Sequence, residues 1–166
     1  MTSKEIFTYL QSEKGIKDLY KKFNKCFKLI DEWSDIFIQG DLLDENQLAH
    51  ALDQSTGVFS KLCPVVNALE SYMERILYNE EHKFYKSQEK IRTQDTSQAK
   101  ALARATVSDI RDYLADFKSY LLASQQNIVS AQSRLKRLVV EAGSKHVASH
   151  GETPVEEPEI KAERNW

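Results

Sequence analysis

The chain has 166 residues, of which 41% are hydrophobic and 29% charged, and its formal net charge is −2. This length fits one domain, or one domain and a tail. The 5 Gly and 3 Pro are few for a sandwich or barrel built on many tight turns. A nearly balanced charge predicts no bulk attraction to nucleic acid or membranes, so any such attraction must come from local patches.

Two helices are predicted in the first forty residues. The first covers residues 2–12, and the second runs from about 16 to 37 with apolar residues at three-and-four spacing. Residues 1–30 hold seven Lys against three acids, whereas residues 31–57 hold seven acids and no Lys or Arg. A solvated helix followed by an acidic loop explains this segregation of charge. The alternative is a basic surface for nucleic acid.

A short third helix is predicted over residues 45–55, after a turn at Gly40 and Asp41. Asp44 is its expected N-cap, and Gln47 stands three residues later, as in a capping box. The acids of this region miss the alternating pattern of a calcium-binding loop, so calcium is not expected.

Two long helices follow and are predicted to form an antiparallel hairpin. The first runs from about Val58 to Ile91 after a restart at Gly57, and Pro64 indicates that its regular part begins near Cys63, because Pro suits the first turn of a helix. The second runs from Gln98 to Gly143. The polar residues 93–98 form the loop between them. The most regular stretch is 108–143, whose apolar or small residues recur every three or four positions. This seam must be buried against helices of this chain or of another copy.

We therefore predict an all-α fold in which a long antiparallel helical hairpin packs with shorter N-terminal helices. Residues 1–143 form the helical bundle domain, with the N-terminal helices in 2–56 and the hairpin in 58–143. Residues 144–166 are expected to form a disordered acidic tail, because residues 147–166 hold five Glu against Lys161 and Arg164.

No residue pattern indicates catalysis, a metal site or a cofactor. Cys26 and Cys63 are expected to be buried free thiols in a reducing cytoplasm. His146 and His150 have the i,i+4 spacing of a zinc-binding pair but lie in the expected tail with no third ligand. No nucleotide-binding, nucleophile or metalloprotease motif occurs, no signal peptide is evident, and no apolar run reaches membrane-spanning length. The chain is predicted not to be an enzyme.

Two basic groups are the candidate nucleic-acid contacts. The first interleaves cations with aromatic residues, and the second lies near the end of the last helix. The candidate contact residues are Lys83, Tyr85, Lys86, Lys90 and Arg92 in the first group, and Arg134, Lys136 and Arg137 in the second. Basic side chains beside aromatic stacking platforms are typical of single-stranded DNA sites. Long cations that merely cover core aromatics are the alternative.

Two phrases, DENQLAHALDQSTGVFSKLCPVVNALE and YLADFKSYLLASQQNIVSAQSRLKRL, resemble small helical proteins of tailed phages. Their layout is similar to that of the T4-type recombination mediator (UvsY-like) family, over about residues 44–143. The resemblance implies single-stranded DNA binding, ring-like homo-oligomers, and the loading of recombinase onto DNA covered by single-stranded-DNA-binding protein. The family's basic DNA-contacting helix would match Lys83, Lys86, Lys90 and Arg92.

Two functions are therefore open. The first is a phage recombination or replication mediator in the host cytoplasm, which binds single-stranded DNA as a homo-oligomer. The second is a non-enzymatic coiled-coil scaffold, adaptor or assembly chaperone of a phage, without any nucleic-acid role. The apolar seam of residues 110–142 supports both equally well.

Overall fold

The computed structural model describes the backbone of residues 3–11, 15–40, 42–88 and 96–149, and the side chains of 4–11, 15–40, 42–86 and 97–142. Within these ranges the chain forms five α-helices and no strand, which confirms the predicted all-α class. The helices are α1 (Ser3–Leu10), α2 (Gly15–Gln39), α3 (Glu45–Gln88), α4 (Thr96–Thr106) and α5 (Ser108–Ser149).

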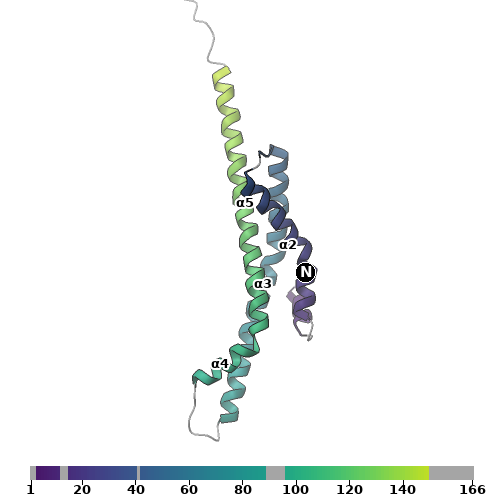
Figure 1. Cartoon of the computed structure of the whole chain (residues 1–166), viewed down its shortest axis with the longest axis vertical. Helices are drawn as coiled ribbons and strands as arrows, with labels where there is room; N and C mark the ends of the chain where they lie inside the picture. Colours follow the sequence, from purple (N-terminus) through teal and green to yellow (C-terminus); the bar gives the residue numbers. More distant parts are fainter. Residues whose placement is uncertain (1–2, 12–14, 41, 89–95, 150–166) are drawn as a thin grey trace, which may run out of the picture.

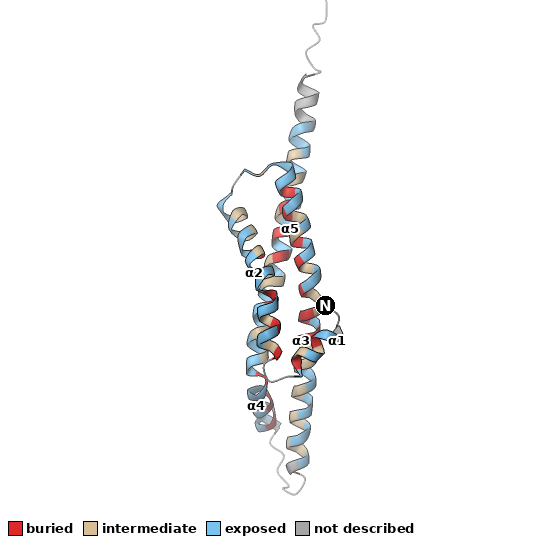
Figure 2. Ribbon diagram, turned by 90° about the vertical axis from the view of Figure 1, so that its right-hand side faces the viewer, coloured by how far each residue is buried: buried red, intermediate tan, exposed pale blue. Residues whose placement is uncertain are grey.

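The helices form an elongated bundle in which α3 and α5 lie side by side (Figure 1). The end of α3 and the beginning of α5 lie at one end of the bundle, where α4 packs against α3. We call residues 78–106 the α3/α4 end. At the other end, the α2–α3 corner (residues 35–45) joins those two helices, and α5 continues beyond it (Figures 1 and 2). The molecule therefore presents two widely separated ends.

An aromatic cluster around Phe117 of α5 fills the core where α2 meets α3 and α5. The Phe117 ring centroid lies 5.4 Å from Phe27, 5.5 Å from Phe23 and 5.7 Å from Tyr20. All three rings belong to α2 and meet Phe117 edge to face, as their quadrupoles favour. Tyr120 stacks on Phe27 with centroids 4.2 Å apart. Figure 2 shows the buried residues gathered in the middle of the bundle.

Helix α3 runs unbroken through both Gly57 and Pro64, so the predicted short helix over 45–55 and the restart at Gly57 are wrong. Both residues lie inside the helix. The reason is a buried seam with alternating steps of three and four that crosses Gly57, formed by Leu48, Ala51, Ser55, Val58, Leu62, Val65 and Leu69. Burial of this seam outweighs the cost of an interior Gly, about 1 kcal/mol, and of an interior Pro, about 3 kcal/mol.

The predicted helix over residues 98–143 is divided at Val107 into α4 and α5. The Val107 side chain is fully buried, and its carbonyl accepts a hydrogen bond from the Arg111 amide at 2.9 Å in the first turn of α5. The Thr106 hydroxyl donates to the Leu102 carbonyl at 3.1 Å, a side-chain bond that competes with the helical ladder and bends helices. Helix α5 then passes Gly143 and ends at Ser149, so the helix continues into the predicted tail. Residues 150–166 of that tail lie outside the described residues.

Polar side chains cap the start of α3 and attach α2 to α5. The predicted capping box is confirmed, because the Gln47 amide donates to the Asp44 carboxylate at 2.7 Å and the Asp44 amide donates to the Gln47 side chain at 3.0 Å. The buried Asn127 amide of α5 donates to the Ile30 carbonyl and to the Ser34 hydroxyl, both at 3.1 Å. These bonds hold α2 against α5 in one register.

Candidate nucleic-acid interface

The first basic group lies on the last turns of α3. Lys83 is exposed and forms an ion pair with Glu80, with 2.7 Å between Nζ and the carboxylate oxygen. Lys86 is also exposed, and no described carboxylate lies within ion-pair distance of it. Lys90 and Arg92, which sequence reasoning placed in the same group, lie outside the described residues. Of the two described cations in this group, Lys86 is therefore the one that no carboxylate of the described residues pairs with.

Aromatic rings accompany these cations. Phe84 and Tyr85 are half-buried, with ring centroids 6.1 Å apart in an edge-to-face contact. Tyr78, which is 70% exposed, lies parallel to the His82 ring at a centroid distance of 6.0 Å. Tyr78, His82 and Lys86 follow one another at i,i+4 spacing, so they share one face of α3. This face presents a flat aromatic pair followed by a cation.

Helix α4 adds two further cations to the α3/α4 end. Ala99, Ala103 and Val107 are fully buried and form the face that packs against α3. Lys100 and Arg104 each follow a buried position by one residue, and both are exposed. The helix contains no acidic residue, and neither cation has an ion-pair partner in the part of the chain that the structure describes. Among its described residues, the α3/α4 end therefore carries three exposed cations without an ion pair to other described residues.

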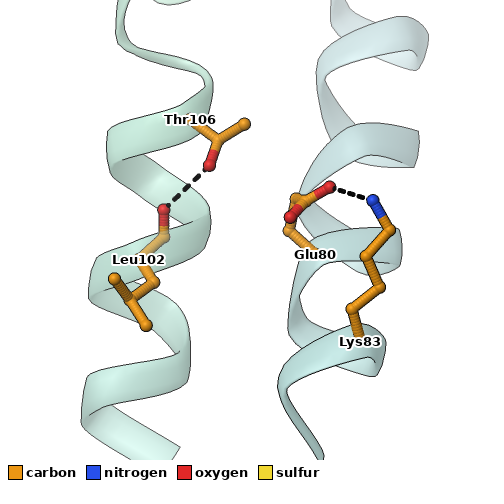
Figure 3. A network of polar contacts seen from close by, with 4 residues as sticks. All are labelled: Glu80, Lys83, Leu102 and Thr106. Carbon is orange, nitrogen blue, oxygen red and sulfur yellow. Dashed lines mark hydrogen bonds and ion pairs between the residues drawn. The ribbon is translucent and has the colours of Figure 1, made fainter. Parts of the chain in front are cut away.

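A shallow apolar groove separates α3 from α4 at this end. Figure 3 shows the Glu80–Lys83 pair on α3 beside the Leu102–Thr106 turn of α4. The groove encloses about 630 Å³ and is lined by Glu80, Lys83, Phe84, Leu102, Ala103, Ala105 and Thr106. Apolar side chains make up most of this lining, and the ion pair stands on its rim. The groove thus provides an apolar surface between the two helices of the α3/α4 end, beside the ion-paired Lys83.

The second basic group lies near the α2–α3 corner, at the far end of the bundle from the first group. Arg134 is half-buried, donates to the Phe37 carbonyl at 2.9 Å, and places its guanidinium 5.1 Å from the centroid of the Phe37 ring. It thereby satisfies a carbonyl in the last turn of α2 that no helical amide can reach. Lys136 and Arg137 are exposed. The structure does not bring the two predicted groups together within one chain.

Sequence reasoning missed four residues of the α3/α4 end: Tyr78, His82, Lys100 and Arg104. The signals were present as i,i+4 spacing, from Tyr78 through His82 to Lys86 on α3, and from Lys100 to Arg104 on α4. Lys100 and Arg104 were hidden because residues 98–143 were treated as one helix. In the structure the break at Val107 lets α4 pack against α3 as a separate element.

Other kinds of site find little support in the described part of the chain. It contains no group of three or more His, Cys, Asp or Glu side chains that could hold a metal ion. Cys26 and Cys63 are free thiols, and each is half-buried. None of the helices with described residues is long and apolar enough to cross a membrane.

Comparisons of this chain with protein-family models, with curated proteins and with solved structures find no match.

Proposed function

We propose that this chain binds single-stranded DNA through the α3/α4 end and acts as a mediator of recombination or replication. The observation that supports the DNA contact is the set of exposed cations Lys86, Lys100 and Arg104, which have no ion-pair partner among the described residues. The parallel Tyr78–His82 pair, which shares one face of α3 with Lys86, supports a preference for single strands, because unpaired bases can stack on an exposed aromatic ring.

In the proposed mechanism, the cations neutralise backbone phosphates and release condensed counterions. The affinity then falls steeply as salt is added. An aromatic platform contributes about 1–3 kcal/mol for each stacked base, with little dependence on base identity. Binding of this kind holds a strand without reading its sequence, which is what a mediator of assembly on DNA requires.

The proposed role in recombination comes from the family resemblance of residues 44–143. The same resemblance implies that the chain is a homo-oligomer without catalytic activity. Its partners would be a recombinase and a single-stranded-DNA-binding protein in the cytoplasm of an infected host cell. In this proposal, α3 and α5 form a long antiparallel hairpin that holds the DNA-binding end away from the α2–α3 corner.

Charge reversal at the α3/α4 end tests the proposal. We expect K86E/K100E/R104E to lower the affinity for a labelled single-stranded oligonucleotide more than tenfold at low salt. The slope of log affinity against log salt should fall by about 2, since each phosphate contact contributes about 0.7. Fluorescence anisotropy at several salt concentrations measures both quantities.

The matched control is K17E/K25E/K28E, which makes the same charge change at exposed lysines of α2. It should retain most of the affinity, because these lysines lie outside the proposed interface. Equal losses in the two variants would mean that bulk charge, and not this interface, governs binding. Unchanged affinity in K86E/K100E/R104E would reject the interface.

A scaffold or adaptor without a nucleic-acid role is the second candidate function. It is favoured by an apolar hollow on α5, of about 520 Å³, lined by Leu122, Gln125, Gln126, Val129 and Ser130. Leu122 and Val129 are both more than half exposed. An exposed apolar strip on a helix is typical of protein–protein contacts. Wild-type protein that binds no oligonucleotide at low salt would favour this second candidate.

A further inference from the structure

The α2–α3 corner exposes large apolar side chains on both α2 and the connection to α3. Ile38 is 82% exposed, and Leu42 is fully exposed. Gly40 between them adopts a φ of 77°, which ends α2 and turns the chain toward α3. These are the most exposed large hydrophobic residues in the described part of the chain. Because both side chains lie on one corner, they form an apolar surface that a partner can cover.

The adjoining segment of α5 exposes a matching apolar surface. The hydrogen bond from Arg134 to the Phe37 carbonyl places this part of α5 beside the end of α2. One to two turns later, Val139 and Val140 are 67% and 69% exposed. Helix α5 continues past the corner to Ser149 (Figures 1 and 2). We call residues 136–149 the α5 arm.

Charges of opposite sign lie on these two surfaces. The corner carries the exposed acids Asp35 and Glu45, within a stretch of residues 31–57 that has no Lys or Arg. The α5 arm begins with the exposed cations Lys136 and Arg137. None of these four side chains has an ion-pair partner within the described part of the chain. Acid and base therefore lie at the same end of one molecule but are not paired there.

From these observations we infer that the α2–α3 corner and the α5 arm form a two-fold interface with a second copy of this chain. A two-fold interface uses the same patch on both subunits, so the patch must complement itself. This patch does so, because the arm of one copy is basic and apolar and the corner of the other is acidic and apolar. Each pairing then occurs twice, and the exposed Ile38 and Leu42 of each copy are covered.

This inference rests on the self-association contained in the proposed function, but it does not depend on DNA binding. The α3/α4 end and the α2–α3 corner lie at opposite ends of α3. The length of this helix, at about 1.5 Å per residue, therefore separates the two surfaces. Loss of DNA binding in K86E/K100E/R104E therefore leaves the dimer intact. Loss of the dimer would in turn leave the cations of the α3/α4 end in place.

Reciprocal charge reversal tests the interface. K136E/R137E gives a chain whose arm and corner are both acidic, and D35K/E45K gives one in which both are basic. Each variant repels itself, but an equimolar mixture restores both complementary contacts. Asp44 is left unchanged because it caps α3. Sedimentation velocity at micromolar concentration measures the mass, and circular dichroism checks that each variant is helical.

We expect the wild-type protein to sediment at twice the mass of the chain, each variant alone at the mass of one chain, and the mixture again at twice that mass. Recovery in the mixture would also show that both variants are folded. The inference would be overturned by a monomeric wild type, by a variant that dimerises alone, or by a mixture that stays monomeric. A wild-type mass above that of a dimer would overturn the two-fold closure.

Discussion

The backbone of α3 at Gly57 does not require a glycine. Gly57 lies inside α3, and a Cβ added there would meet no atom within 4 Å. Because Gly in a helix interior costs about 1 kcal/mol relative to Ala, we expect G57A to raise the free energy of unfolding by about 0.5–1 kcal/mol. Urea denaturation followed by circular dichroism measures the change.

Gly40 provides the matched control for this substitution. A Cβ there would also meet open space, but the φ of 77° is one that residues with a side chain rarely adopt. We therefore expect G40A to lower the free energy of unfolding. If G57A destabilised the protein instead, helix α3 would not be continuous at that position.

We expect two tyrosines, Tyr20 and Tyr120, to make the stability of the fold sensitive to alkaline pH. Burial and, next, the carboxylate of Asp116 raise the pKa of Tyr20 above its ordinary value of about 10, and burial and Asp31 do the same for the pKa of Tyr120. A raised folded-state pKa means that the folded chain holds the phenolic proton more tightly than the unfolded chain. The stability from this source is complete below pH 10 and is lost as the pH rises above 10.

We therefore expect the free energy of unfolding of the wild type to be steady just below pH 10 and to fall as the pH rises above 10. Because phenylalanine has no proton to lose, Y20F/Y120F should show a shallower decline over the same range. Urea denaturation at several pH values compares the two slopes. Parallel declines would assign the alkaline sensitivity to other groups, such as the lysines.

At the scale of the elements, Asn127 is a buried polar link between α5 and α2. Its buried side chain bonds to both Ile30 and Ser34 of α2. We expect N127A to lower the free energy of unfolding by about 1–3 kcal/mol, because it leaves the Ser34 hydroxyl without this partner. Asn24 is an exposed residue on α2, and N24A is the control that should change stability little. Equal effects of the two substitutions would contradict the role of Asn127.

The elements also show which parts of the fold the sequence could predict. The heptad-like spacing identified α2 and most of α5, and the capping signature identified the start of α3 at Asp44 and Gln47. Gly57 and Pro64 led to the prediction of a helix boundary in this region, because both residue types have a low helix propensity. Tertiary burial of Leu62 and Val65 overrides those propensities in the folded chain.

The candidate site was predictable only in part, because the residues that α4 contributes depend on tertiary packing. Lys83, Tyr85 and Lys86 were chosen from residue type and spacing on one helix. The contribution of Lys100 and Arg104 depends on the docking of α4 against α3, which no local pattern encodes. Arg134 was chosen for its charge, but in the structure it bonds to the end of α2.

At the scale of the whole molecule, the acidic segment that follows α5 begins far from the α3/α4 end. Residues 150–166 hold five Glu against Lys161 and Arg164. The 42 residues of α5 place Ser149 about 60 Å from the α3/α4 end, at about 1.5 Å per residue. Even a fully extended chain of about 3.5 Å per residue would not bring Glu163 back to those cations. Deletion of residues 150–166 should therefore leave the affinity for single-stranded DNA unchanged when it is measured by fluorescence anisotropy, and an increase in affinity would contradict this account.

The central claim is that the chain binds single-stranded DNA, and one measurement tests it most directly. Labelled single-stranded and double-stranded oligonucleotides of equal length are titrated with the wild-type protein at two salt concentrations, and fluorescence anisotropy reports binding. We predict binding that favours the single strand and weakens steeply with salt. The absence of binding at the lower salt concentration would contradict the claim and leave the scaffold function in its place.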